Sequence, residues 1–366
     1  MSDFLDPTRI GPKAVALKES LSRMIVGQEE AVREIVNIYQ MHLTGLNPSD
    51  RPIGNLLFLG PTGTGKTRIV EATAESLVGN PRAVIKIDCG EFQHSHEIAK
   101  LIGSPPGYLG HRETHPLLSQ EVLNQHQTEA VHISFVLFDE IEKASDSLWN
   151  LLLGILDKAI LTLGDNNRAD FSRAMIFMTS NLGTAEMSAI LNPKMGFAAG
   201  IKTPPTSLNK KMTAKIYRTG TDAARKKFMP EFLNRLDKIV VFNPLGEDKL
   251  RSVLDIELGM VQQQILDSDN PNCHFVFRLN AAAKTLVLHD GTDMKYGARH
   301  LKRAIKKLLV QPMSNLMATN QIRGGDLLVV DCPDRELIFV REEEGLEFNQ
   351  MAEIAGFKGM TMATTT

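Results

Sequence analysis

The first 245 residues alternate between short apolar runs and longer segments of mixed polarity. An apolar run of about five residues is typical of a strand buried on both faces of a parallel sheet. Strands are predicted in this way over residues 55–59, 83–87, 134–138, 174–178 and 239–242. Helix is predicted over residues 12–44, with a break at 26–28, and over residues 65–77. Strands that alternate with helices indicate an α/β fold in which helices cover both faces of a parallel sheet.

The pattern changes near residues 243–246, and helices are predicted to dominate downstream. Apolar residues fall there at helical spacing on one face, at Leu301, Ala304, Ile305, Leu308 and Leu309. The opposite face is basic, at Lys302, Arg303, Lys306 and Lys307. A solvated helix surface explains this basic face more simply than nucleic-acid binding does. The expected organisation is a large domain over 1–245, a smaller, mainly helical C-terminal domain over 246–342, and a flexible tail over 343–366.

Charge and composition narrow the functional classes. The chain has 41 Lys plus Arg and 43 Asp plus Glu, a formal net charge of −2, so the overall charge gives no support to nucleic-acid binding. Its three cysteines lie far apart, without metal-ligand spacing, which suits a reducing compartment. The N-terminus lacks the basic start and apolar run of a signal peptide, and no apolar stretch approaches the ~18–20 residues of a membrane span. A cytoplasmic protein without a membrane partner is expected.

One glycine-rich segment indicates a specific chemistry. Residues 60–67 fit the pattern G-x-x-x-x-G-K-[ST] and lie between a predicted strand and a predicted helix. Such a loop wraps phosphates with its backbone N–H groups, while its lysine binds the outer phosphates and its last hydroxyl binds Mg²⁺. The segment therefore predicts an ATP site formed by Gly60, Pro61, Thr62, Gly63, Thr64, Gly65, Lys66 and Thr67.

A pair of carboxylates complements this loop. Asp139 and Glu140 directly follow the predicted strand 134–138, and ligands of open α/β sheets bind at the carboxyl ends of the strands. Asp139 is expected to hold Mg²⁺ together with Thr67, partly through water. Glu140 is expected to polarise the attacking water, because phosphoryl transfer depends on positioning and charge stabilisation. The sequence thus predicts an ATP hydrolase.

Further segments resemble the AAA+ ATPases of the Clp unfoldase family. They occur in the family's order over roughly residues 10–340, at 25–31, 51–54, 139–144, 179–183, 230–237 and 296–303. The resemblance is closest to the second ATPase ring of two-ring Clp chaperones, here as a single module. It implies a homo-oligomeric ring, with six subunits as the expected number, that uses ATP to thread polypeptide substrates through a central pore.

The resemblance also implies roles for individual residues. Ile25 and Val26 would pack against the adenine, and Asn181 would sense the γ-phosphate or the lytic water. Arg299 would sense nucleotide from the small domain. Arg235 resembles the arginine finger offered to the ATP of a neighbouring subunit, where a planar, always-charged side chain suits the developing phosphoryl charge.

Two loop segments resemble contact sites for other chains. Tyr108 and Leu109, in a glycine-flanked segment, resemble the pore loop that grips substrate. Met195, Gly196 and Phe197 resemble the tripeptide that docks some Clp unfoldases onto a barrel peptidase, although methionine replaces the usual β-branched residue or leucine. The segment 117–133 is longer than in the family, and its histidines, His126 and His132, lack convincing metal-ligand spacing, so it is interpreted as a modified surface loop.

Three functional hypotheses follow from the sequence. The first is the threading unfoldase. The second is a regulatory or assembly AAA+ ATPase that rearranges one partner complex without processive threading. The third, a nucleic-acid motor, is disfavoured by the near-neutral charge and by the tyrosine of the pore loop.

Overall fold

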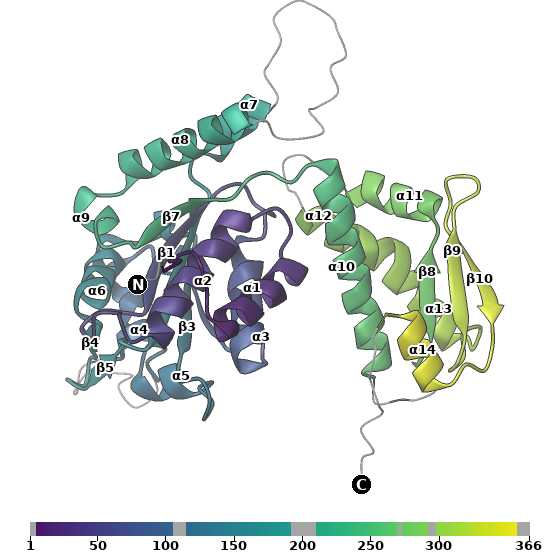
Figure 1. Ribbon diagram of the computed structural model, residues 1–366, viewed down its shortest axis with the longest axis horizontal. Coiled ribbons are helices and arrows are strands. Elements are labelled where there is room, and N and C mark those ends of the chain that lie inside the picture. Colours follow the sequence, from purple (N-terminus) through teal and green to yellow (C-terminus); the bar gives the residue numbers. More distant parts are fainter. Residues whose placement is uncertain are drawn as a thin grey trace, which may run out of the picture. The chain divides into compact units, whose positions relative to one another are not determined.

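The structure, a computed structural model, describes residues 5–104, 115–191, 210–268, 270, 273–291 and 298–356 (Figure 1). The chain forms two compact units, Met1–Pro244 and Leu245–Thr366. The division lies one residue before the domain boundary expected from the sequence.

The first unit is built on a five-stranded sheet with the order β2-β3-β6-β1-β7. All neighbouring strands in it are parallel, which confirms the predicted α/β class. Its strands are β1 (Gly54–Leu59), β2 (Val84–Asp88), β3 (Ser134–Asp139), β6 (Ala174–Ser180) and β7 (Lys238–Val241). Chain order and sheet order differ, so that β6 lies between β1 and β3.

Side chains of the central strands alternate between two cores, one on each face of the sheet. On β1, Leu57 and Leu59 belong to one core, whereas Leu56 and Phe58 belong to the other. Every residue of β1 is buried. Burial on both faces explains why these strands appear in the sequence as continuous apolar runs.

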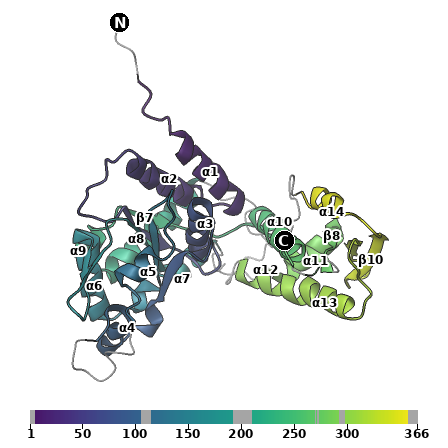
Figure 2. The same cartoon turned by 90° about the horizontal axis from the view of Figure 1, so that it is seen from below.

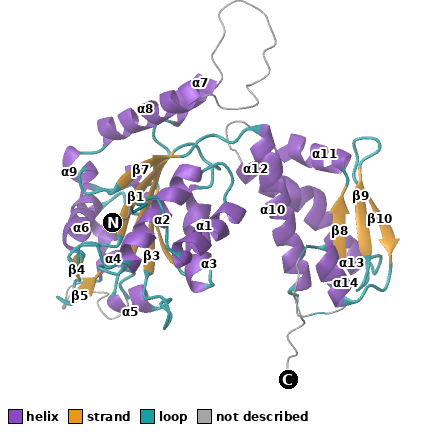
Figure 3. Cartoon of the chain, viewed as in Figure 1, coloured by secondary structure: helices purple, strands orange, loops and turns teal. Residues whose placement is uncertain are grey.

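Helices cover each face (Figures 2 and 3). One core includes residues of α1 (Pro12–Met24), α2 (Glu29–Leu43) and α3 (Lys66–Val78). The other includes residues of α6 (Asp146–Lys158), α7 (Thr184–Leu191) and α8 (Lys210–Lys227). Shorter elements are α4 (Ala99–Ile102), α5 (Gln120–Asn124), α9 (Pro230–Leu233), and an antiparallel pair of β4 (Ile160–Thr162) and β5 (Arg168–Asp170).

The predicted break in the first helical segment falls where α1 ends and α2 begins. Gly27 has a φ of 76°, a left-handed conformation that glycine adopts without a steric penalty. Gln28 follows it as the residue before α2. The chain therefore turns between the two helices at a position that the glycine in the sequence marks.

The second unit is mainly helical, but it also contains a three-stranded sheet that the sequence analysis did not predict. Its helices are α10 (Glu247–Leu266), α11 (Ala281–Gly291), α12 (Ala298–Ile305) and α13 (Gln311–Ala318), with a π-helical turn, η5 (Lys306–Val310), between the last two. The sheet has the order β10-β9-β8 and consists of β8 (Val276–Leu279), β9 (Leu327–Asp331) and β10 (Ile338–Glu343). These strands have four to six residues each, and β10 is an exposed edge strand in which the apolar residues 338–340 are followed by the charged residues 341–343.

Part of the segment expected to be a flexible tail is folded. After β10, α14 (Phe348–Ile354) follows, and its Met351 packs in a small core with Leu266, Val276 and Leu327. The tail expected over 343–366 therefore does not hold for residues 343–356. In the described parts of the chain, no helix is both long and apolar enough to cross a bilayer.

Candidate nucleotide-binding site

The glycine-rich loop, residues 60–67, lies between β1 and α3, at the carboxyl edge of the sheet. Gly60 has a φ of 144°, and a Cβ added there would lie 2.7 Å from the carbonyl oxygen of Phe242. Only glycine allows this close approach to the chain that leaves β7. The loop thus begins against the backbone of a neighbouring strand, at the edge where ligands of parallel α/β sheets bind.

The N-terminus of α3 opens toward this loop. Gly65, the N-cap residue, has a φ of 99°, and within the described residues no side chain caps the helix. A Cβ added at Gly65 would meet no atom within 4 Å. The first N–H groups of a helix have no partner within the helix, and together with the helix dipole they suit an anionic phosphate. The loop therefore fits the phosphates of a nucleotide.

Lys66 lies back over the loop. Its side chain is nearly buried, with 8% of the residue exposed. Its Nζ donates hydrogen bonds to the carbonyl oxygens of Gly60 (2.6 Å) and Pro61 (3.0 Å) and to Oδ1 of Asn181 (2.9 Å). These hydrogen bonds hold the lysine charge at the loop.

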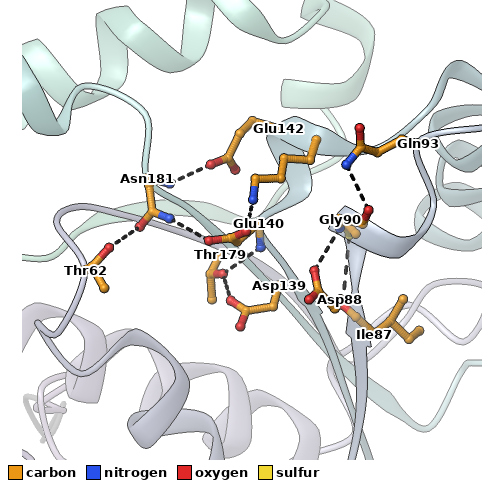
Figure 4. Close-up of polar contacts among 12 residues, drawn as sticks. Thr62, Ile87, Asp88, Gly90, Gln93, Asp139, Glu140, Glu142, Thr179 and Asn181 are labelled. Atoms are coloured by element: carbon orange, nitrogen blue, oxygen red, sulfur yellow. Dashed lines mark hydrogen bonds and ion pairs between the residues drawn. The ribbon is translucent and has the colours of Figure 1, made fainter. Parts of the chain in front are cut away.

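Asn181 connects the loop to the carboxylates. It follows β6, the strand between β1 and β3, so its side chain lies between Lys66 and the acidic pair. Its Nδ2 donates to Oε1 of Glu140 at 3.2 Å, and its main-chain N–H donates to Oε1 of Glu142 at 3.1 Å (Figure 4). Thr62 also donates to Oδ1 of Asn181, at 3.5 Å. Lys66, Asn181 and Glu140 therefore come together from distant parts of the chain. Lys66 and Asn181 are 115 residues apart, and Asn181 and Glu140 are 41 residues apart.

Thr179 supports the carboxylate pair, and the sequence analysis assigned it no role. Its hydroxyl donates to Oδ1 of Asp139 and accepts from the main-chain N–H of Glu140 at 3.1 Å (Figure 4). Thr179 is 1% exposed. Glu140 has a φ of 56°, a left-handed conformation that is rare outside glycine and costs roughly 1–2 kcal/mol. The only signal in the sequence is a threonine directly after the predicted strand 174–178, since the carboxyl ends of parallel strands meet at one edge of the sheet.

Gln28 is a second residue that the sequence analysis missed. It is 4% exposed, and its Nε2 donates to the carbonyl oxygens of Thr64 (3.1 Å) and Asn243 (2.9 Å). Its Oε1 accepts from the main-chain N–H of Asn243 at 3.1 Å. Gln28 therefore fastens the glycine-rich loop to the chain after β7. Ile25, which is buried, and Val26, which is half-buried, immediately precede this turn.

Cys89 lies close to the acidic residues but does not add a nucleophile. Burial raises the pKa of its thiol, and the negative charges of Asp88, Asp139, Glu142 and Glu140 raise it further. A thiol with a raised pKa stays protonated at neutral pH, and only the thiolate is reactive. The chemistry of this edge therefore rests on the carboxylates, Asn181 and Lys66.

The metal-binding expectation concerns Thr67 and Asp139. Thr67 lies in the first turn of α3 and Asp139 ends β3, and both are half-buried. Within the described ranges, no group of three or more His, Cys, Asp or Glu residues could hold a metal ion by itself. Mg²⁺ is commonly held by one or two protein oxygens together with nucleotide phosphates and water, so a threonine and an aspartate beside a phosphate loop fit this ion.

Arg235 lies at the opposite, amino edge of the sheet. Two residues later, the main-chain N–H of Asp237 donates to the carbonyl oxygen of Asn55 at 3.0 Å, and Asn55 donates back to Oδ2 of Asp237 at 2.7 Å. This contact is at the start of β1, whereas the glycine-rich loop follows its end. Six residues at ~3.3 Å per residue place about 20 Å between them. Arg235 therefore lies far from the phosphate loop of its own subunit.

The guanidinium of Arg235 is only partly satisfied. Its Nη2 lies 3.0 Å from Oε1 of Glu231, and its Nε lies 3.8 Å from Oδ1 of Asp157. Its Nη1 is buried and has no hydrogen-bond partner among the residues that the structure describes. Nearby, burial raises the pKa of the Asp237 carboxyl. The hydrogen bond from the main-chain N–H of Asn55 and the charge of Arg51 lower this pKa, but they do not cancel the rise.

The remaining predicted residues are placed as follows. Arg299 is exposed in the first turn of α12, in the second unit. The predicted pore-loop residues Tyr108 and Leu109 lie outside the described residues, as does the predicted docking tripeptide Met195, Gly196 and Phe197.

Comparisons with known proteins define the class. The family model described as AAA domain (Cdc48 subfamily) matches residues 51–239, just over half of the chain. The chain therefore belongs to the AAA ATPase family. A second model, for the C-terminal D2-small domain of ClpB protein, matches residues 245–330. Both matches confirm the resemblance to the second ATPase ring of Clp chaperones.

Individual relatives agree with this assignment. The chain is 33% identical over 330 residues to the chaperone protein ClpB of Pseudomonas putida, covering 89% of this chain and 35% of the relative. It is 35% identical over 332 residues to ClpB of Gloeobacter violaceus, covering 90% and 34%. The chain thus spans about a third of the length of these relatives.

Solved structures of Hsp104 are similar in fold. A closed-state reconstruction of Hsp104 with ATPγS and FITC casein gives a TM-score of 0.71, and the extended conformation of a Saccharomyces cerevisiae Hsp104–casein complex gives 0.73. Sequence identity is 27% in both cases, over 90% of this chain and 52% of the solved chain.

Proposed function

We propose that this chain is an ATP hydrolase whose copies assemble into a ring, with six subunits as the expected number, that unfolds polypeptides by threading them through its pore. The observation that carries the proposal is the meeting of Lys66, Asn181 and Glu140 at the carboxyl edge, directly beside the open N-terminus of α3. The similarity to ClpB and Hsp104 supports the remodelling of proteins as the use of that hydrolysis.

In this proposal the nucleotide lies along the glycine-rich loop. The N–H groups of the loop and of the first turn of α3 bind its phosphates, and Lys66 moves from the loop carbonyls to the outer phosphates. Ile25 and Val26 contact the adenine. Thr67 and Asp139 would hold Mg²⁺, which would neutralise charge on the phosphates.

Glu140 is the catalytic residue for water activation. Its carboxylate stands one residue beyond Asp139, and Asn181 lies within hydrogen-bond reach of both Glu140 and Lys66. Asn181 is therefore suited to sense whether a γ-phosphate is present. Arg299 adds a second sensor from the smaller unit, as the family resemblance implies.

Arg235 completes the site of a neighbouring subunit. The position at the amino edge, about 20 Å along β1 from the subunit's own phosphate loop, supports action in trans. The buried Nη1, which has no partner within the described part of the chain, supports it as well, because a buried polar group normally finds an acceptor. Hydrolysis is therefore expected to depend on ring assembly.

Threading is assigned to Tyr108 and Leu109, as gripping residues of a pore loop. The competing function is an assembly ATPase that rearranges one partner complex without threading. The purified protein should unfold a stably folded, tagged substrate in the presence of ATP. Tyr108→Ala should keep basal ATP hydrolysis but lose this unfolding. Unfolding that is unchanged in Tyr108→Ala would favour the assembly ATPase.

Two further assignments complete the proposal. Docking of Met195, Gly196 and Phe197 onto a barrel peptidase of the Clp type stays a prediction. A cytoplasmic location, without a membrane or nucleic-acid partner, agrees with the near-neutral charge and the sparse cysteines.

A further inference from the structure

We propose that Lys143 is a positioning residue for Glu140, which it holds by one carboxylate oxygen so that the other is free for the attacking water. The inference rests on the proposed ATP hydrolysis. Its basis is an ion pair in which Nζ of Lys143 lies 2.5 Å from Oε2 of Glu140.

The two oxygens of Glu140 have different partners. Oε2 is held by Lys143, and Oε1 accepts from Nδ2 of Asn181 at 3.2 Å. The Asn181 side chain is in turn bound by Lys66 at 2.9 Å. A γ-phosphate attracts both Lys66 and Asn181, so its arrival draws the donor away from Oε1. Because Lys143 does not belong to that phosphate network, Oε2 stays fixed and Oε1 becomes the free acceptor.

Local structure explains why Lys143 can do this. It ends a single 3-10 turn, η3 (Ile141–Lys143), that follows Glu140, and its main-chain N–H donates to the Glu140 carbonyl at 2.9 Å. Glu140 caps this turn in a left-handed conformation, with a φ of 56°, and the tight turn brings Lys143 back to the glutamate. Ile141 is fully buried and anchors the turn. Two residues after Lys143, the main-chain N–H of Ser145 donates to the carbonyl oxygen of Phe92 at 3.0 Å.

The electrostatic setting also favours Lys143 as a fixed partner. Asp88 and Asp139 are paired across β2 and β3, and the charges of these two residues, Glu142 and Glu140 all raise the pKa of Cys89. The hydrogen bond to Glu140 raises the pKa of Lys143, and the charges of Glu140, Asp88 and Glu142 raise it further. The lysine stem passes Gly90, where an added Cβ would lie 3.7 Å from Cδ of Lys143. Two lysines thus flank the acidic group, Lys66 from the phosphate loop and Lys143 from η3.

The chain offers a matched control for this ion pair. Lys86 on β2 also lies 2.5 Å from a carboxylate, that of Glu71 on α3. The exposed fraction of the side chain is 49% for Lys143 and 47% for Lys86. It is 34% for Glu140 and 26% for Glu71. Lys86→Met therefore removes the same kind of interaction, at similar exposure, from a pair that lies outside the Asn181–Glu140 network.

The test compares Lys143→Met, Lys143→Arg and Lys86→Met in steady-state ATP hydrolysis and in binding of a fluorescent ATP analogue. Lys143→Met should lower kcat about tenfold, because a misoriented catalytic group costs up to ~100-fold. Binding of the analogue should change less than twofold. Lys143→Arg should recover most of the loss, and Lys86→Met should match the unmutated protein. In single turnovers of Glu140→Gln, adding Lys143→Met should have no further effect, since Lys143 acts only through Glu140.

Several results would overturn the assignment. Equal rates for Lys143→Met and Lys86→Met, or a rate increase in Lys143→Met, would show that Lys143 does not position Glu140 for attack. A further loss in the Glu140→Gln background would show that Lys143 acts elsewhere. An unmutated protein that binds the analogue but never hydrolyses ATP under any assembly condition would refute the proposed function itself, and with it this inference.

Discussion

The two edges of the central sheet both carry the charged residues assigned to hydrolysis, but they differ in how those charges are satisfied. At the carboxyl edge, Nζ of Lys66 has three acceptors, and each oxygen of Glu140 has a donor. Oε2 of Glu142 is buried there and has no hydrogen-bond partner in the described ranges, but Glu142 has no assigned catalytic role. At the amino edge, Nη1 of Arg235 is buried and lacks a partner among the described residues.

This difference indicates two kinds of site. The carboxyl edge brings Lys66, Asn181 and Glu140 together within one chain, so the groups proposed to bind and hydrolyse ATP belong to a single subunit. The amino edge holds a guanidinium whose Nη1 has no hydrogen-bond partner among the described residues, although Glu231 and Asp157 pair with its other nitrogens. In the proposed ring, this arginine would complete the nucleotide site of a neighbouring subunit.

The largest expected effect concerns the incomplete edge. Arg235→Ala should bind nucleotide normally but hydrolyse it roughly 10³-fold more slowly, because an arginine finger contributes 10³–10⁵ in kcat. Mixing this variant with Lys66→Ala subunits should restore part of the activity, since each supplies the half-site that the other lacks. Specific ATPase activity should also rise with protein concentration. Full activity of a diluted monomer would contradict action in trans.

The next effect tests the complete edge. Glu140→Gln should bind ATP but hydrolyse it about 10²–10³-fold more slowly, because the phosphate loop survives while a general base worth 10²–10⁴ is lost. Lys66→Ala should instead lose tight ATP binding. Equilibrium binding and single-turnover hydrolysis separate the two. A normal rate in Glu140→Gln would remove this carboxylate from the mechanism.

Both edges were partly predictable from the sequence. The phosphate loop and the Asp139–Glu140 pair follow from local patterns, because each is contiguous and stands at the end of an apolar run. Thr179 and Gln28 were missed as contributors, since their roles depend on which strand lies beside which. The strand order, with β6 between β1 and β3, is not written in any local segment.

The second unit shows the same limit. The apolar spacing of Leu301, Ala304 and Ile305 correctly predicts the buried face of α12. The sheet of β8, β9 and β10 has strands of only four to six residues, and the edge strand is largely exposed. Apolar residues do occur in these strands, for example over residues 327–330 of β9, but the pairing of β8 with β9 depends on contacts between residues far apart in the chain.

A smaller effect tests the support of the carboxyl edge. Thr179→Val removes the hydroxyl that joins Asp139 to the N–H of Glu140, and should lower kcat about tenfold through loss of carboxylate orientation. Thr73→Val is the matched control, because Thr73 is also fully buried and donates to Ile69 at 2.7 Å within α3. Each change should cost about 1 kcal/mol of unfolding free energy. Equal rates in the two variants, with matched thermal melts, would deny Thr179 its positioning role.

The smallest expected effect tests whether the Glu231–Arg235 ion pair at the amino edge competes with assembly or supports catalysis. Glu231 binds Nη2 of Arg235 at 3.0 Å, and its side chain is 63% exposed. If Arg235 must turn to a neighbour's nucleotide, this pair competes with assembly, and exposed ion pairs contribute about 0.2–1 kcal/mol. Glu231→Gln should therefore lower the protein concentration for half-maximal ATPase activity by about twofold to fivefold, with the same maximal rate.

Asp222→Asn is the control for that measurement, because Asp222 pairs with Arg225 on α8 and its side chain is also 63% exposed. Its activity curve should coincide with that of the unmutated protein. A maximal rate that falls more than tenfold in Glu231→Gln would instead mean that Glu231 holds Arg235 in its working orientation. The amino edge would then resemble the carboxyl edge, where a carboxylate and its cation act together, and the contrast between the two edges would no longer hold.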